Sequence, residues 1–287
     1  MKPRTVQQIT AAIPVLMGSD TIYQPFPSHA LRQVDPFILL HHWGPYNFTT
    51  HNDALSLSAH PHRGFEPVTF IFHGEVHHRD SVGNDSIIKE GGVQWMTAGK
   101  GIVHSEMGTE DFHKNGGELE IIQVWMNLPK RLKMTTPFYQ GFQKDAVPYI
   151  MKDNEKVKVN LFSGKIGNVT GPVKSITGID AFTLYMKKNG KVSLEPDEKK
   201  NAMLYLLNGS IIVNGKKIPN GRNVVTFETG GTAINIEAID ESKMLLLAGI
   251  PIQEPLAQYG PFVMNTPEDL QEAFDDFHEG KMGILND

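Results

Sequence analysis

Two short stretches of this sequence carry side chains that can bind a metal ion. The first, "SAHPHRGFE", places His60 and His62 on either side of a proline, with Glu66 four residues further on. The second, "AGKGIVHSEMG", places His104 two residues before Glu106. Side chains two residues apart on a β-strand point to the same face. If both stretches are neighbouring strands, three imidazoles and a carboxylate meet in one interior.

That set of side chains suits a divalent transition metal. Imidazole binds iron, copper, nickel and zinc, and one carboxylate lowers the net charge of the site. Four protein ligands on an octahedral ion leave coordination positions open for a substrate, water or dioxygen. Of the 12 histidines, all but His278 lie at or before His113. This uneven distribution indicates that the first half of the chain uses imidazole for a purpose.

Composition excludes several classes of protein. The 287 residues are 40% hydrophobic and 21% charged, which is typical of a globular protein with a sizeable core. A net charge of -5 gives no electrostatic basis for direct nucleic-acid binding. Cysteine is absent, so disulfides and thiol chemistry are excluded. No apolar run approaches the roughly 20 residues that span a bilayer, and the opening residues do not resemble a signal peptide. We expect a cytoplasmic protein that binds no membrane.

Short apolar or alternating runs, such as "PVTFIF" and "KVKVNLFSG", dominate the chain and are separated by turns rich in glycine and asparagine. Many short strands with few helical stretches predict an all-β protein built from sandwiches or barrels. Four Asn-Gly dipeptides in the second half indicate hairpin turns. They begin at Asn189, Asn208, Asn214 and Asn220.

One short helix is predicted near the C-terminus, in "NTPEDLQEAFDDFHEGK". Thr266 can cap its first turn, Pro267 suits the first helical position, and Gly280 follows its end. Four apolar residues share one face, so we expect the helix to pack against a sheet. They are Leu270, Ala273, Phe274 and Phe277.

The two halves of the chain have similar patterns. When "FIFHGEVHHRDSVGNDSIIKEGGVQWMTAG" is aligned with "LYLLNGSIIVNGKKIPNGRNVVTFETG", Gly74 matches Gly209 and the hairpins between differ mainly in length. This similarity predicts a duplicated β unit. We therefore expect an N-terminal domain at residues 1–135 and a C-terminal domain, including the helix, at residues 136–287.

The duplication also indicates which half of the chain carries the expected metal ligands. At the positions that match His60 and His62, the second half has Glu195 and Asp197. No histidine lies between His113 and His278. The second domain is thus expected to keep the fold and to lack the metal ligands.

The motifs "HPHRGFE", "QWMTAG" and "GIVHSE" together resemble the signature of the pirin family of the cupin superfamily. The segment "PFVMNTPEDLQEAFDDFHEGKMG" is similar to the C-terminal segment of pirin-like proteins. The resemblance implies a bicupin fold with one metal in the N-terminal domain. It implies Fe(II), with nickel, copper, zinc or manganese as alternatives, bound by the residues here numbered His60, His62, His104 and Glu106.

The resemblance also implies an activity, quercetin 2,3-dioxygenase. In that reaction a flavonol binds the metal through its 3-hydroxyl, loses the proton to a base such as Glu106, reacts with O2 and releases carbon monoxide. Two alternatives stay open: an iron-binding regulatory protein that acts on a protein partner, and a cupin that acts on another small molecule. A monomer is expected, because two packed domains can bury each other.

Several neighbouring residues have undecided roles. Glu66 competes with Glu106 as the fourth ligand, because many cupins use a glutamate shortly after His-x-His; the pirin resemblance favours Glu106. His77 and His78 are adjacent and must face opposite sides of a strand, so at most one points inward. We expect both to lie on the surface of a hairpin. His41 or His42 lies near the domain mouth in this interpretation, and the sequence does not decide which.

Overall fold

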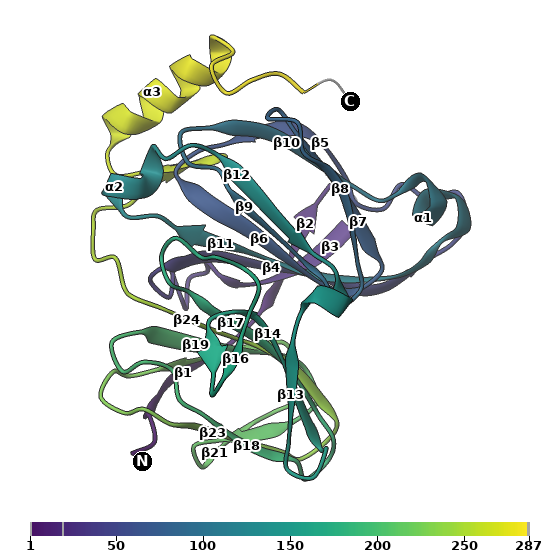
Figure 1. The fold of residues 1–287 in the computed structure, drawn as a ribbon, viewed down its shortest axis with the longest axis vertical. Helices are drawn as coiled ribbons and strands as arrows, with labels where there is room; N and C mark the ends of the chain where they lie inside the picture. Colours follow the sequence, from purple (N-terminus) through teal and green to yellow (C-terminus); the bar gives the residue numbers. More distant parts are fainter. Residues whose placement is uncertain (1, 19, 286–287) are drawn as a thin grey trace. The chain divides into compact units, whose positions relative to one another are not determined.

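The computed structural model describes residues 2–18 and 20–285 of the chain. It separates into two compact units, each built mostly from β-strands (Figure 1). The histidine unit comprises Leu39–Lys144 and Ile252–Asp287, and the apolar-core unit comprises Met1–Ile38 and Asp145–Pro251. This division differs from the boundary at residue 135 expected from the sequence. Each end of the chain packs within the unit that is built mainly from the other half.

In the histidine unit, two antiparallel sheets enclose the interior. The larger sheet contains strands in the order β12-β9-β6-β11-β4, and the smaller has the order β5-β10-β7-β8. The strands of the larger sheet are β4 (Phe37–Phe48), β6 (Phe65–His73), β9 (Val93–Thr97), β11 (Gly117–Asn127) and β12 (Phe138–Phe142). Those of the smaller sheet are β5 (Ser56–His62), β7 (Glu75–Asp80), β8 (Asp85–Lys89) and β10 (Ile102–Met107).

Further elements complete this unit. They are the helices α1 (Glu110–Asn115), α2 (Lys130–Lys133) and α3 (Pro267–His278), and the strands β25 (Ala257–Tyr259) and β26 (Phe262–Met264). None of the helices in the described part of the chain is long and apolar enough to cross a membrane.

The apolar-core unit repeats the two-sheet plan. Its sheets have the orders β1-β22-β19-β24-β17-β14-β13 and β18-β23-β20-β21. The larger sheet consists of β1 (Val6–Ala11), β13 (Tyr149–Lys152), β14 (Val157–Ser163), β17 (Asp180–Met186), β19 (Asn201–Asn208), β22 (Asn223–Phe227) and β24 (Ser242–Gly249). The smaller consists of β18 (Lys191–Leu194), β20 (Ile211–Val213), β21 (Lys216–Ile218) and β23 (Ile234–Ala238). Two further pairs are β2 (Ile13–Met17) with β3 (Asp20–Phe26), and β15 (Lys165–Ile166) with β16 (Val169–Thr170).

Strand pairing supports the duplication predicted from the sequence. In the histidine unit β6 pairs with β9 and with β11, while β7 pairs with β8 and with β10. In the apolar-core unit β19 pairs with β22 and with β24, while β20 pairs with β21 and with β23. The sheets are open, so each unit is a two-layer β-sandwich rather than a closed barrel.

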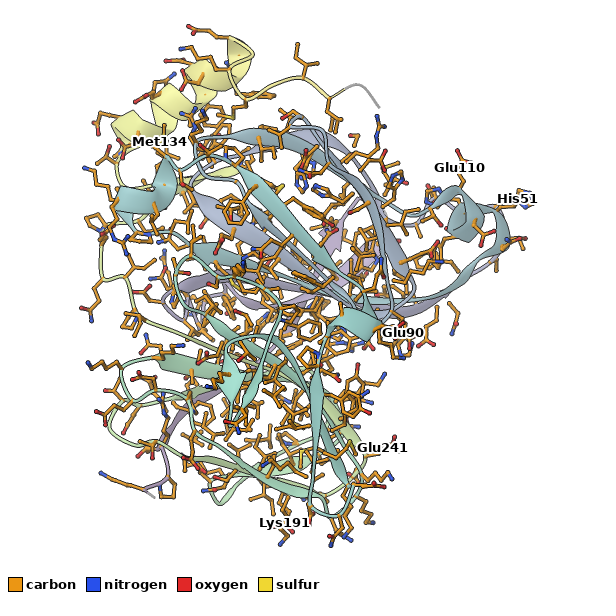
Figure 2. All side chains as sticks on the ribbon, in the orientation of Figure 1. His51, Glu90, Glu110, Met134, Lys191 and Glu241 are labelled. Atoms are coloured by element: carbon orange, nitrogen blue, oxygen red, sulfur yellow. The ribbon has the colours of Figure 1, made fainter. Side chains whose placement is uncertain are left out.

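The two interiors differ in polarity. Apolar side chains fill the space between the sheets of the apolar-core unit, with Leu161, Leu204 and Leu246 among its fully buried members. Glu195 and Asp197 follow β18 and are exposed. Polar side chains such as Lys191 and Glu110 point away from the sheets (Figure 2).

The prediction that the four Asn-Gly dipeptides form hairpin turns is confirmed at one of them. Only the turn at Asn214 joins paired strands, β20 and β21, and Asn214 and Gly215 both have positive φ, 46° and 83°. The turns at Asn189, Asn208 and Asn220 join strands that lie in different sheets. The hairpin prediction was therefore wrong at those three turns, because consecutive strands of a sandwich often cross between its layers.

The predicted C-terminal helix is confirmed as α3. Thr266 Oγ1 accepts a hydrogen bond from the Asp269 amide, and the Asp269 carboxylate accepts one from the Thr266 amide, which completes a capping box. The helix packs against β25 and β26, and Ala273 lies in a cluster with Val103 of β10 and Phe262 of β26.

The buried Lys133 connects the C-terminal segment to Gly64, which follows strand β5 and its two histidines. Lys133 is 1% exposed, and its Nζ donates hydrogen bonds to Gly64 O at 2.8 Å, Asn127 Oδ1 at 2.6 Å and Val263 O at 2.9 Å. Gly64 has a φ of +88°, and a Cβ there would collide with the Val263 carbonyl oxygen. Burial lowers the pKa of Lys133 to about 7. Three acceptors nevertheless call for the three N–H donors of an ammonium group.

We expect Lys133→Met to lower the free energy of unfolding by about 2–4 kcal/mol, because three buried oxygens lose a donor. Urea unfolding measures the change. Lys130→Met, an exposed lysine on the same short helix, is the matched control and should shift stability by less than about 0.5 kcal/mol. Equal effects of the two substitutions would show that the buried amine does not hold this segment.

Candidate metal centre

Strand register brings the predicted histidines into one row. β10 lies between β5 and β7, so His104 is directly opposite His60 on one side and Asp80 on the other. His62 is opposite Ile102 on the same pair of strands. Residues directly opposite on antiparallel strands project to the same face. The side chains of His60, His62 and His104 therefore share the interior of the histidine unit.

The three histidines form one compact group. One ring nitrogen from each lies within 4.8 Å of the others, a spacing that can hold a metal ion. Ring centroids are 4.4 Å apart for His60 and His104, 4.8 Å for His60 and His62, and 4.9 Å for His62 and His104. His62 and His104 are buried, while His60 is half-buried and gives the group access to solvent.

Backbone carbonyls fix the tautomer of two of the rings. His60 Nδ1 lies 2.7 Å from Ser58 O, and His62 Nδ1 lies 3.1 Å from Pro261 O. A carbonyl oxygen only accepts hydrogen bonds, so each Nδ1 must carry the proton. The Nε2 atom of each ring consequently presents a lone pair, which is the form that binds a metal.

His104 completes the set from a different environment. Its Nδ1 lies 3.5 Å from Nδ1 of His78. Its Nε2 is fully buried and has no hydrogen-bond partner among the described residues. A buried polar atom without a partner is costly, and a metal ion satisfies it. The donor set therefore fits a divalent transition metal.

Burial keeps the rings of His62 and His104 neutral. It lowers the pKa of His62 to about 3, with a further contribution from His60, while the bond to Pro261 opposes the shift. Burial, followed by His62, His60 and His78, also holds the pKa of His104 well below its usual range. Neutral imidazoles are the ligand form, so metal binding at neutral pH displaces no proton from these two rings.

Glu106 lies outside the converging group. Its carboxylate is buried and accepts hydrogen bonds from three donors: Thr69 Oγ1 at 3.1 Å and Gln94 Nε2 to Oε1, and Gln123 Nε2 at 2.7 Å to Oε2. The strand carries a bulge between His104 and Glu106 where it pairs with β5. The role of Glu106 as a fourth ligand stays a prediction.

Glu66 faces the other side of its sheet. On β6 the odd-numbered Phe65 and Thr69 contact His62 and Glu106, so the even-numbered Glu66 points away from them. Its Oε1 accepts a hydrogen bond of 2.5 Å from Thr97 Oγ1, and the residue is fully buried. Burial raises the pKa of Glu66 to about 7, although the Thr97 bond opposes the shift. Of the two glutamates considered as ligands, Glu106 is therefore the one on the side of the histidines.

His77 and His78 lie on opposite faces of β7, as their adjacency predicts. His77 is partly exposed and pairs with Asp85 at 2.8 Å. His78, by contrast, is 1% exposed and contacts His104, so the expectation that both lie on the surface was wrong for this residue. The signal in the sequence was Asp80, two residues on and therefore on the same face.

The remaining histidines near the interior do not join the triad. His42 is buried, with Nε2 3.2 Å from Glu120 Oε1. Burial lowers the pKa of His41 to about 4. Neither belongs to the group whose ring nitrogens converge in the described part of the chain.

Aromatic rings flank the triad. Trp125 packs against His62 with ring centroids 5.2 Å apart, and Phe65 packs against both at 4.9 Å from His62 and 4.3 Å from Trp125. Trp125 and Gln123 keep partial exposure on the interior side of β11. The partly exposed residues beside the triad and Glu106 are thus His60, Gln123 and Trp125.

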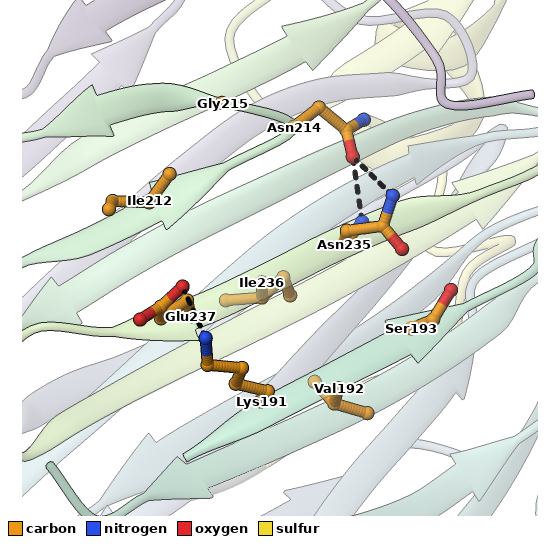
Figure 3. Close-up of a pocket in the computed structure, with 9 residues that line it drawn as sticks. All are labelled: Lys191, Val192, Ser193, Ile212, Asn214, Gly215, Asn235, Ile236 and Glu237. Atoms are coloured by element: carbon orange, nitrogen blue, oxygen red, sulfur yellow. Dashed lines mark hydrogen bonds and ion pairs between the residues drawn. The ribbon is translucent and has the colours of Figure 1, made fainter. Parts of the chain in front are cut away.

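A groove in the apolar-core unit is a weaker candidate for a functional site than the histidine triad. It has a volume of about 470 Å³ and runs over the outer face of β18, β20 and β23 (Figure 3). Its polar groups pair with one another, Lys191 with Glu237 at 3.0 Å and Asn214 with Asn235 (Figure 3). We therefore place the candidate site at the histidine triad.

Comparison with known proteins agrees with the motifs. Residues 19–126 match the Pirin family and residues 181–283 match the Pirin C-terminal cupin domain. A pirin-like protein of Caulobacter vibrioides is 40% identical over 255 residues, covering 87% of this chain and 88% of that protein. A Pseudomonas aeruginosa protein provisionally named quercetin 2,3-dioxygenase is 33% identical over 250 residues, 87% of each. The crystal structure of a quercetin 2,3-dioxygenase from Acinetobacter baumannii has a TM-score of 0.92 at 32% identity, covering 99% of this chain and 100% of that one.

The placement of Glu66 gives a prediction about pH. Its pKa is about 7 in the folded protein against 4.5 as the ordinary value. Between these values the folded state holds a proton that the unfolded state has lost, so stability falls as pH rises through this window. We expect Glu66→Gln to remove that fall, so that the variant gains about 2–3 kcal/mol relative to wild type between pH 4.5 and pH 8.

Urea unfolding of the metal-free proteins across this range measures the difference, and metal binding by the variant should match wild type. A stability difference that does not change with pH contradicts the burial argument. Loss of metal binding in Glu66→Gln would indicate that Glu66 is a metal ligand.

Proposed function

This chain belongs to the pirin family, and we propose that it is a metal-dependent dioxygenase of quercetin-like flavonols. One observation carries the proposal: three imidazoles converge within 4.8 Å, and the partners of two of them direct Nε2 inward. The relatives named for quercetin 2,3-dioxygenase support the substrate class.

Fe(II) is the metal we propose, because the family resemblance implies it; nickel, copper, zinc or manganese can occupy the same nitrogens. When bound, such an ion supplies Lewis-acid chemistry by lowering the pKa of a hydroxyl coordinated to it. His60, His62 and His104 would hold the ion, with Glu106 proposed as the fourth ligand.

Glu106 is also the proposed base for the flavonol 3-hydroxyl. A carboxylate has about four lone-pair directions, and Thr69, Gln94 and Gln123 occupy three of them. The remaining direction, on Oε2, is available for a ligand bond or for a proton. Because three donors hold the group in place, little reorganisation is needed when the proton moves.

The surrounding side chains suit a flat aromatic substrate. Trp125, which is partly exposed, offers a ring face beside His62, and the buried Phe65 ring packs against it; planar aromatic molecules pack well on such a face. The partial exposure of His60 and Trp125 gives the side from which a substrate would enter. The apolar wall excludes water from the flavonol anion while O2 reacts with it.

The proposed overall reaction conserves atoms. Both atoms of O2 enter the product as the central ring opens, and one carbon leaves with one oxygen as carbon monoxide. Oxygen uptake and carbon monoxide release should therefore be equal.

We expect the protein loaded anaerobically with Fe(II) to consume O2 with quercetin and to release an equal amount of carbon monoxide. Two variants assign the roles: His62→Ala should lose the metal and the turnover together, while Glu106→Gln should lower kcat by about 100-fold or more if the carboxylate is the base. An oxygen electrode, a carbon monoxide assay and metal analysis measure these quantities. Exposed His77→Ala is the matched control and should be unaffected.

Wild-type protein that holds its metal and consumes no O2 with quercetin would contradict the proposed activity. The partner-binding alternative would then gain support if His62→Ala abolished binding of a defined protein partner. Turnover of a different small molecule would instead support a cupin of other specificity. The cytoplasm and a monomer stay the expected compartment and state on sequence grounds alone.

A further inference from the structure

A fourth imidazole, outside the triad, lies against the most deeply buried ligand. His78 is 1% exposed, and its Nδ1 lies 3.5 Å from Nδ1 of His104. Its other nitrogen, Nε2, lies 3.1 Å from Oδ2 of Asp80. The order Asp80–His78–His104 thus forms a line of contacts that leads from a carboxylate to the metal-binding group.

Asp80 is a well-anchored carboxylate at the start of this line. Its Oδ1 accepts hydrogen bonds from the amides of Val82 and Asn84, and Asn84 Nδ2 donates to Oδ2 at 2.7 Å. Burial acts to raise the pKa of Asp80, but the hydrogen bonds from His78 and Asn84 outweigh it and lower the pKa. Asp80 is therefore charged at neutral pH and acts only as an acceptor.

Tyr139 holds the plane of the intermediate ring. It stacks on His78 with centroids 4.2 Å apart and an interplanar angle of 13°. The Tyr139 hydroxyl oxygen accepts a hydrogen bond from Ser86 Oγ at 2.7 Å. With its plane fixed by Tyr139 and one edge held by Asp80, the His78 ring has its Nδ1 edge directed at His104.

These contacts determine where the protons lie. The Asp80 carboxylate only accepts, so His78 Nε2 carries a proton, and neutral His78 then has a lone pair on Nδ1. That lone pair requires the proton of His104 to be on Nδ1. His104 Nε2, which has no other partner among the described residues, is left with a lone pair facing the triad.

The tautomer of His104 is fixed less firmly by its immediate partner than the tautomers of His60 and His62 are. The Nδ1 atoms of His60 and His62 lie 2.7 and 3.1 Å from carbonyl oxygens. A carbonyl oxygen can only accept a hydrogen bond, so each of these Nδ1 atoms must carry the proton. His104 faces a ring nitrogen, which donates in one tautomer and accepts in the other. The contact is also the longest of the three, at 3.5 Å. The tautomer of His104 consequently depends on the state of His78.

We propose that His78, oriented by Asp80 and Tyr139, is a positioning residue that holds His104 in the Nδ1–H tautomer and so makes its Nε2 a metal ligand. The inference rests on the metal-binding role proposed above for the triad. Partners of this kind, which orient a ligand without touching the metal, typically change metal affinity by about 10–100-fold when they are removed.

The test measures Co(II) affinity of the full-length protein by competition with a chelator, together with the Co(II) absorption spectrum. His78→Phe keeps a ring to stack on Tyr139 and removes both nitrogens, so its Kd should rise by about 10–100-fold. His78→Asn places an amide oxygen near the position of Nδ1 and should stay within about three-fold of wild type. His77→Phe, the neighbouring ring on the outer face, is the matched control and should not change the Kd.

A second readout needs no metal. Long-range ¹H–¹⁵N correlation in the metal-free protein distinguishes the two tautomers of each histidine, and His104→Asn assigns the signals. We expect His104 in the Nδ1–H form in wild type and a mixture in His78→Phe. An Nε2–H form in wild type, or an unchanged tautomer and Kd in His78→Phe, would overturn the inference.

These readouts separate the two proposals. Wild-type protein that binds no Co(II) contradicts the proposed metal site, while the tautomer measurement still decides the role of His78. Should His78→Phe fail to fold, Asp80→Asn takes its place: it removes the charge that orients His78, and a several-fold weaker Kd is expected. An unchanged Kd and tautomer in Asp80→Asn would then overturn the inference.

Discussion

Three imidazoles that share one small interior impose the constraint on which the rest of the site depends. Rings with centroids less than 5 Å apart cannot all be protonated, because like charges at that separation repel strongly where water is excluded. Burial keeps the pKa of His62 and of His104 low, so these two rings are neutral, and each must place its one proton on the nitrogen that faces away from the others. The partners of the outward nitrogens are what make three histidines into a donor set.

Those partners come from three different segments of the chain. Ser58 belongs to the same strand as His60, Pro261 belongs to the C-terminal segment, and His78 belongs to the next strand of the sheet. The C-terminal segment is in turn held by the buried amine of Lys133. The packing of the chain end within the histidine unit is thus linked, through the Pro261 carbonyl, to the tautomer of His62.

The duplicated unit shows what the fold needs without a metal. It keeps the pairing of β19 with β22 and of β20 with β21, but its interior is filled by apolar side chains such as Leu204 and Leu246. A cupin sandwich therefore does not require polar residues between its sheets. The buried Glu106 and Gln94 beside the triad carry a cost in burial that structural stability alone does not explain, and a functional site does.

Much of this could be predicted from local patterns. Strand parity placed His60 and His62 on one face of their strand and His104 and Glu106 on one face of theirs, and the helix signals at Thr266 and Pro267 identified α3. What parity cannot supply is the identity of neighbours across strands, so it could not tell that His78 is the inward member of its pair. It also could not show that three of the Asn-Gly turns change sheets, because that depends on which strands pair at long range. The assignment of each chain end to the unit built mainly from the other half likewise depends on long-range pairing, which local patterns do not show.

The central claim is that three Nε2 atoms converge on a single ion. Diffraction from crystals of the iron-loaded protein, with anomalous data collected on both sides of the iron absorption edge, tests it most directly. The account predicts one strong peak per chain, within bonding distance of Nε2 of His60, His62 and His104. A peak coordinated through Nδ1, or iron found only elsewhere in the chain, would contradict it.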